Sequence, residues 1–390
     1  MRFISRALWC LAALLSSFFP AGQSSAAPAF TERSAAAIER AAAEHIAAGK
    51  SVGLAVEVIQ NGQVVFARGF GKASLEWNTP VSTETVFRIA SNTKTFTAVS
   101  VLLLVQKRGL SLDDKLSKFL PEFPRADAVS IRQLLTHTSG ITTFDEIYRD
   151  KPELNLPRSQ AEMLALISRL QPAYRFEPGT AYQYSNSGYH LLGAIIEKVS
   201  GQSLEQFMKD NIFDPVGMRH TAMDESADIV PQRAAGYMRD PQRPHVFTNA
   251  PYIPYTTPGP AGGLRSTIDD LAKWHVALFS GKLIGPDLLQ QMTSAGTLAD
   301  GRPSSAVVWG MTNPPVPPPY EYGFGIRMSS LKGHRELWHS GAIDGFTSQI
   351  RTYPDDNVTI VVLANTFRAL DGFLEAVQSA ALGLSEPATK

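Results

Sequence analysis

Strand-forming segments at both ends of the chain, with helical segments between them, most limit the folds this sequence can adopt. Near the start, residues 52–60 and 63–71 are rich in β-branched residues and are joined by Asn61-Gly62, a strong β-hairpin signal. Near the end, four segments again have strand composition: 322–328, 337–339, 346–353 and 358–364. Strands from both ends can bury their apolar faces in one shared sheet. The pattern therefore predicts an α+β fold with an antiparallel sheet built from both terminal segments.

Helical signals fill the middle of the chain. Between residues 110 and 295 we predict five helices: 130–135, 159–170, 187–199, 203–211 and 266–280. Further helices are predicted at 34–50, before the hairpin, and at 370–382, after the last strand. The proline-dense segment 313–319 is predicted to be a loop. We therefore expect one domain over 27–390, in which 27–109 and 296–390 form an α/β part and 110–295 a mostly helical insert.

The first 26 residues have the features of an export signal. Arg2 and Arg6 give a charged start, residues 7–19 are apolar, and residues 24–26 offer small side chains at a cleavage site. A membrane anchor is the alternative, but the apolar stretch is short for a bilayer and Pro20 interrupts it. We predict a signal peptide over 1–26 and a periplasmic or secreted protein without a membrane anchor after its removal.

Composition excludes several function classes. Cys10 is the only cysteine, so the predicted mature protein has no disulfide, thiol nucleophile or cysteine-ligated metal. The chain has 36 basic and 36 acidic residues, and no basic patch indicates nucleic acid or an anionic membrane as a partner. The eight histidines lack a ligand spacing such as H-E-x-x-H. We expect neither a metal nor another cofactor.

Ser91 and Lys94 form a Ser-x-x-Lys pattern where an extended segment is predicted to run into an apolar helix. The start of a helix favours a developing negative charge, and Lys94 would lie one turn further on the same face. Lysine can remove the serine proton if burial or positive charge keeps it neutral. The alternative is a capping serine beside a solvated lysine, which we prefer for the same spacing at Ser329 and Lys332.

Tyr184-Ser185-Asn186 is the only Tyr-x-Asn sequence in the chain and precedes an apolar helix. A phenol beside a lysine ammonium can lose its proton below its usual pKa of about 10, and could then act first as a base and later as an acid. The Asn186 amide could orient the lysine or a substrate carbonyl. The alternative is a turn tyrosine followed by a helix-capping asparagine.

His339-Ser340-Gly341 ends a predicted strand and is followed by Ala342. A glycine there would let a substrate lie against the strand edge, and the N–H groups of Ala342 and Ser91 could hold an oxyanion. The alternative is a strand-end turn with a partly buried histidine. His137, in the turn after a predicted helix, is interpreted as structural.

These three motifs, in this order, resemble the serine β-lactamase and penicillin-recognising hydrolase superfamily. The chain is most similar to the class C β-lactamase-related branch, which includes esterases, D-aminopeptidases and DD-peptidases. Residues 134–140, 184–193 and 262–270 are also similar to that branch, so the resemblance covers nearly the whole mature chain. It implies a β-lactamase/transpeptidase-like fold. It also implies that Ser91 is the nucleophile and that Lys94 and Tyr184 form the proton-handling pair. The substrate-binding residues that it implies are Asn186, His339, Ser340, Gly341 and Ala342.

One departure from the family pattern affects the expected substrate. Penicillin-directed members often carry Lys-Thr-Gly in the third motif, whereas His339 stands in the lysine position here. A histidine near its usual pKa of about 6.5 is mostly neutral, which favours uncharged esters or amides over β-lactams. We expect an exported serine hydrolase that forms an acyl-enzyme with a small ester, amide or D-amino-acid peptide. The alternatives are a DD-carboxypeptidase or D-aminopeptidase of cell-wall peptides, a β-lactamase, and a non-catalytic module that binds penicillin or peptidoglycan.

Overall fold

The computed structural model describes residues 27–148, 155–240, 242–243, 245–310 and 318–385. The predicted signal peptide over 1–26 lies outside these residues, as do residues 313–317 of the proline-dense segment. No helix within the described residues is long and apolar enough to cross a membrane.

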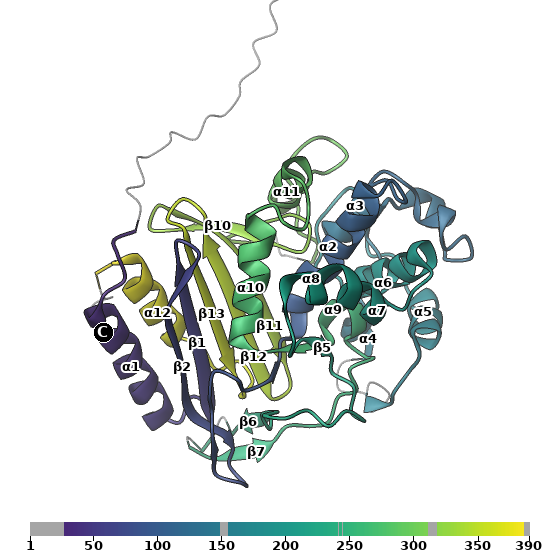
Figure 1. The fold of residues 1–390 in the computed structure, drawn as a ribbon. Coiled ribbons are helices and arrows are strands. Elements are labelled where there is room, and N and C mark those ends of the chain that lie inside the picture. Colours follow the sequence, from purple (N-terminus) through teal and green to yellow (C-terminus); the bar gives the residue numbers. More distant parts are fainter. Residues whose placement is uncertain (1–26, 149–154, 241, 244, 311–317, 386–390) are drawn as a thin grey trace, which may run out of the picture.

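An eight-stranded antiparallel sheet forms the centre of the molecule (Figure 1), in the order β3-β2-β1-β13-β12-β11-β10-β9. Its strands are β1 (Gly53–Gln60), β2 (Gln63–Ser74), β3 (Thr79–Pro80), β9 (Glu321–Tyr322), β10 (Arg327–Leu331), β11 (His334–Ile343), β12 (Phe346–Tyr353) and β13 (Val358–Ala364). The N-terminal strand β1 pairs antiparallel with the C-terminal strand β13. The sheet is therefore built from both terminal segments, which confirms the predicted fold class.

Helices cover both faces of this sheet. On one face, α1 (Glu32–Ala47) and α12 (Phe373–Leu382) pack side by side (Figure 1). On the other face lie α10 (Ile268–Phe279) and the helical part of the molecule. Every residue of β1 and β13 is buried, because side chains that alternate between the two faces meet a packed layer on either side.

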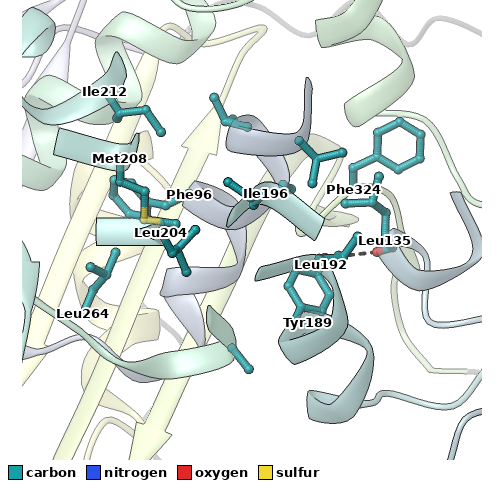
Figure 2. Packing of buried hydrophobic residues seen from close by; sticks show 14 of the residues in the cluster. Phe96, Leu135, Tyr189, Leu192, Ile196, Leu204, Met208, Ile212, Leu264 and Phe324 are labelled. Carbon is teal, nitrogen blue, oxygen red and sulfur yellow. Dashed lines mark hydrogen bonds between the residues drawn. The ribbon is translucent and has the colours of Figure 1, made fainter. Parts of the chain in front are cut away.

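The helical part surrounds α2 (Thr93–Gln106), which is buried from Thr93 to Leu104 and has no polar face. Phe96 of α2 stacks on Trp274 of α10 with ring centroids 4.1 Å apart. Figure 2 shows Phe96 packed beside Leu204 and Met208. The other helices are α3 (Ile131–Leu135), α4 (Phe144–Tyr148), α5 (Gln160–Ser168), α6 (Asn186–Ser200), α7 (Leu204–Met208), α8 (Asp214–Val216), α9 (Gly259–Gly262) and α11 (Pro286–Met292).

Short strands also lie within the predicted insert and just before it. A three-stranded sheet joins β4 (Phe87–Arg88), β8 (Leu264–Ser266) and β5 (Ala222–Met223), and β6 (Tyr237–Arg239) pairs with β7 (Phe247–Asn249). Strands of two or three residues are too short to show a period in the sequence. The β4 strand leads directly into the 3-10 turn η1 (Ala90–Asn92), which precedes α2.

Candidate active site

Ser91 lies in the middle of η1, one turn before α2, rather than in the first residue of the helix. The preceding residue, Ala90, has a φ of 46°, a left-handed conformation that non-glycine residues rarely adopt. Ser348 of β12 holds the turn, because its hydroxyl donates to the Ile89 carbonyl and accepts from the Asn92 amide, both at 2.7 Å. Ser91 is thus presented by a turn that the central sheet fixes.

The Lys94 amine contacts three oxygen atoms at the site. It donates to Asn186 Oδ1 and to the Ala261 carbonyl, both at 2.7 Å, and lies 3.2 Å from Ser91 Oγ. Carbonyl oxygens can only accept, so two of these contacts use N–H groups of the amine. In a neutral amine the remaining lone pair can then face the Ser91 hydroxyl and accept its proton. Asn186, the first residue of α6, therefore orients the lysine.

The environment of Lys94 favours this neutral form. Its side chain is fully buried, and burial lowers the pKa of the amine well below its usual value. Asp145 opposes this effect by raising the pKa, while the positive charge of Arg327 lowers it further. Both conditions stated for a lysine base, apolar burial and a neighbouring cation, are present.

Tyr184 differs from the expected phenolate. Lys94 Nζ lies over the Tyr184 ring, 4.7 Å from its centroid, instead of beside the phenol oxygen. Burial raises the pKa of Tyr184 above its usual value, and the charge of Arg327 and the proximity of Ser91 offset this only in part. The hydroxyl is enclosed and has no hydrogen bond of good geometry within the described residues. Tyr184 is therefore protonated at neutral pH, so it can start as an acid but not as a base.

The His339 side chain also differs from its expected position. Only 1% of His339 is exposed. Its Nδ1–H donates to the Ser340 carbonyl at 2.7 Å, and its Nε2 accepts from the Tyr322 hydroxyl at 3.0 Å. Burial, with help from Arg327 and Lys94, lowers the pKa of His339 well below its usual value. The ring is therefore a neutral, hydrogen-bonded part of the interior instead of an exposed group at the strand end.

The structure gives a different explanation for the glycine at position 341 from the one expected. A Cβ at this position would lie 2.2 Å from the Ile89 carbonyl oxygen, so a side chain would push η1 away from β11. The glycine thus lets the Ser91 turn approach the strand. Ala342 follows it and is exposed. Beyond Trp338, β11 has no pairing to β10 within the described residues. The backbone of Ser340, Gly341 and Ala342 therefore has no strand partner on the β10 side.

Arg327, the first residue of β10, is a site residue that sequence reasoning missed. Its guanidinium donates to Ser340 Oγ at 2.7 Å and lies 5.7 Å from the Tyr184 ring centroid and 4.9 Å from that of Trp338. An arginine is always charged, so a fixed cation stands beside the third motif after all. Its place follows from the pairing of Arg327 with Trp338, a register that one sequence does not reveal.

The second Ser-x-x-Lys pattern can also be placed. Ser329, the alternative serine, donates to Glu336 at 2.6 Å and accepts from the Trp338 indole at 2.8 Å. It lies on β10 and its contacts are structural.

Comparison with known proteins places the chain in a known family. The family model described as Beta-lactamase matches residues 38–384. Penicillin-binding protein 4* of Bacillus subtilis (strain 168) is 28% identical over 316 residues, which cover 78% of this chain and 66% of that protein. Protein flp of Staphylococcus aureus (strain MW2) is 29% identical over 330 residues, or 81% of this chain and 60% of that protein. The chain thus spans about two thirds or less of the length of these curated relatives.

Solved structures show the same fold. The octameric penicillin-binding protein homologue from Pyrococcus abyssi is 28% identical with a TM-score of 0.76, covering 90% of this chain and 78% of that one. The D-amino acid amidase from Ochrobactrum anthropi SV3 complexed with L-phenylalanine also has a TM-score of 0.76, at 24% identity and with 89% and 98% of the two chains covered. Because the family model spans nearly all of the described residues, the chain belongs to the Beta-lactamase family.

Proposed function

We propose that the protein is a serine hydrolase that cleaves an ester or amide through an acyl-enzyme on Ser91. The observation that carries this proposal is the buried Lys94 amine, whose two short contacts to Asn186 and Ala261 leave its lone pair for the Ser91 hydroxyl. Names of the relatives, which include penicillin-binding proteins, agree with acylation of this kind.

In the proposed chemistry Lys94 accepts one proton and Tyr184 donates another. Ser91 Oγ attacks the substrate carbonyl carbon while its proton passes to Lys94 Nζ. The N–H groups of Ser91 and Ala342 are proposed to hold the oxyanion. The Tyr184 hydroxyl then protonates the leaving alcohol or amine. The proton held by Lys94 returns to the Tyr184 phenolate through the water that enters the site, which restores both groups. Water attacks the acyl-enzyme by the same route, which releases the acid and regenerates Ser91.

The position of Arg327 favours a second, narrower candidate function. A guanidinium bonded to Ser340 Oγ supplies a fixed cation and a hydroxyl at the edge of β11. Carboxylates are the natural partners of such a cation. This cation weighs against the predicted preference for uncharged substrates, which was inferred from a neutral His339 and stays a prediction. DD-carboxypeptidase or β-lactamase activity, on substrates that carry a carboxylate, becomes a specific alternative to a general esterase or amidase.

Covalent labelling tests the proposed nucleophile. A fluorophosphonate or a fluorescent penicillin should label the wild-type protein, and Ser91→Ala should abolish labelling and turnover because only a hydroxyl is lost. Ser329→Ala is the matched control and should label normally. Turnover by the wild type of nitrophenyl esters, D-alanyl amides or nitrocefin would separate an enzyme from a binding module that only becomes acylated. Labelling that persists in Ser91→Ala would reject the assignment.

Export remains part of the proposal. The features of residues 1–26 support it. N-terminal sequencing of protein recovered from the periplasm or culture medium should give a chain that begins near Ala27. Full-length protein in the cytosol would contradict it.

A further inference from the structure

His137 contacts both residues that flank Tyr184 in the chain. It lies in the turn after α3, with only 1% of its surface exposed. Its carbonyl accepts the backbone N–H of Gln183 at 3.0 Å, and its ring Nδ1 accepts the backbone N–H of Ser185 at 3.1 Å. One residue therefore fixes the backbone immediately before and after Tyr184.

The His137 ring also contacts the phenol itself. Its centroid lies 4.4 Å from that of Tyr184, while the Lys94 amine is 4.7 Å from the same phenol centroid. On its remaining sides the imidazole meets Tyr322, at 4.5 Å, and Tyr189, at 5.2 Å. The ring thus fills the space that would otherwise let the Tyr184 side chain shift.

The hydrogen bond from Ser185 defines the chemical form of His137. A backbone N–H can only donate, so Nδ1 carries no proton and the neutral ring must carry its proton on Nε2. That Nε2 is buried without a hydrogen-bond partner in the described residues. Burial and the charges of Lys94 and Arg327 keep the pKa of His137 well below its usual value. The acceptor at Nδ1 therefore persists at neutral pH.

Backbone geometry indicates that this residue is held in place at a cost. His137 has a φ of 60°, in the left-handed region where asparagine, aspartate and histidine are enriched but still uncommon. Ser185, whose N–H it binds, is the N-cap of α6, and its hydroxyl accepts the Gly188 N–H. The His137 contact therefore also sets where α6 begins, and so where Asn186 meets Lys94.

We propose that His137 is a positioning residue for the acid–base pair. Its Nδ1 fixes the Ser185 amide and thereby places the Tyr184 hydroxyl near Ser91 and Asn186 Oδ1 against the Lys94 amine. It does not touch the reacting atoms. The assignment rests on the proposed hydrolase function and goes beyond the structural role that the sequence suggested for this histidine.

A matched pair of variants tests the Nδ1 contact. His137→Asn keeps an acceptor, since asparagine Oδ1 occupies the same position along the side chain as histidine Nδ1, and asparagine tolerates the left-handed φ. His137→Leu has the shape of the asparagine variant but no acceptor. We expect His137→Leu to have a kcat on the order of 10- to 100-fold lower than His137→Asn, with KM changed much less, because a misplaced proton donor slows chemistry rather than binding.

The assay must separate positioning from loss of folded protein. Rates are therefore expressed per site labelled by fluorophosphonate and measured well below the melting temperature of each variant. Equal kcat values per site for the two variants would overturn the proposal, because the acceptor would then be irrelevant. A higher KM with an unchanged kcat would overturn it as well, since the acid–base pair would then still be in place.

A readout independent of turnover keeps this inference distinct from the proposed function. In Ser91→Ala protein labelled with ¹⁵N-histidine, the His137 ring should show the neutral form with its proton on Nε2, unchanged between about pH 5 and pH 8. A proton on Nδ1, or titration in that range, would overturn the contact even if the enzyme were active. A wild type without turnover would instead reject the hydrolase proposal and leave the ring assignment standing.

Discussion

Lys94 and Tyr184 have different environments, and these suggest different roles. Burial lowers the pKa of the lysine and raises the pKa of the tyrosine, so at neutral pH the first tends toward a free base and the second toward a protonated acid. The sequence predicted that both residues form a proton-handling pair. It could not show which of the two is the base and which the acid, because the pKa of each group depends on the side chains that enclose it.

Removing either member should slow turnover sharply. Lys94→Ala and Tyr184→Phe should each lower kcat by about 10²- to 10⁴-fold, the usual contribution of a positioned acid or base. If the two act as one unit, the double variant should be little worse than the poorer single variant. Steady-state kinetics of all three on one ester substrate would check this. Multiplicative losses would mean that the two residues act in separate steps.

Arg327 should determine how well substrates with a carboxylate compete. Arg327→Gln removes the fixed cation beside Ser340 and should lower kcat/KM for nitrocefin relative to a neutral nitrophenyl ester by roughly tenfold or more, as expected for a charge-assisted hydrogen bond. Paired kinetics on the two substrates give this ratio directly. Arg335→Gln, at an exposed arginine paired with Asp355, is the control and should leave the ratio unchanged. An unchanged ratio in Arg327→Gln would remove the case for a carboxylate subsite.

At the scale of elements, buried strands were predicted best. The predicted strands 346–353 and 358–364 coincide with β12 and β13. Packed layers on both faces make β13 almost continuously apolar, whereas β12 mixes apolar and polar residues. By contrast, the predicted strand 337–339 is only part of β11, whose exposed and polar residues obscure its length. The predicted helices differ from the observed ones mainly at their ends, whereas the short helices α4, α8, α9 and α11 were not predicted. The site residue Arg327 was missed because strand register is a property of the paired strands.

The approach of η1 to β11 predicts the effect of adding one methyl group. Gly341→Ala would place a Cβ 2.2 Å from the Ile89 carbonyl oxygen, which must displace the turn that carries Ser91. We expect a lower melting temperature and a kcat that falls by about 10²-fold, the effect of misplacing a reacting group by about 1 Å.

A second glycine provides the control for this substitution. At Gly188, inside α6, an added Cβ would have no neighbour closer than 3.6 Å. Gly188→Ala should therefore be tolerated or slightly stabilising, because alanine is the better helix former. Thermal melts and labelled-site kinetics of both variants would test the difference. Normal kcat in Gly341→Ala would show that the close approach does not position Ser91.

Across the whole molecule, the site forms where three segments distant in sequence meet. Ser91 and Lys94 follow β4, Tyr184 and Asn186 lie at the start of α6, and Arg327 belongs to the C-terminal strands. The order of the motifs allowed their convergence to be predicted from family resemblance. Their distances follow from the fold. The division of residues 27–390 into an α/β part and a mostly helical insert stays a prediction. The insert also contains the short strands β5, β6, β7 and β8.

Glu57 links the stability of the whole fold to pH. It lies on β1 beneath α10 and is 2% exposed, and its Oε1 has no hydrogen-bond partner in the described residues. Burial raises the pKa of Glu57 to about 7, with a further increase from Asp269 and a partial offset by Lys273. In the unfolded chain the carboxyl would titrate near 4.5. The stability that its protonated form contributes is fully present below about pH 4.5 and is lost as the pH rises to about 7.

Replacing this carboxyl by an amide should remove that dependence. A shift of this size corresponds to about 3 kcal/mol at most, so Glu57→Gln should raise the melting temperature by several degrees at pH 8 and by little at pH 4. The exposed Glu44 of α1 provides the control, because Glu44→Gln changes the same charge without changing a buried group. Differential scanning calorimetry at the two pH values would measure both variants. If Glu57→Gln destabilised the protein at pH 8, the buried carboxylate would have to be stabilised by contacts that outweigh its burial, and the pH dependence of unfolding would have another origin.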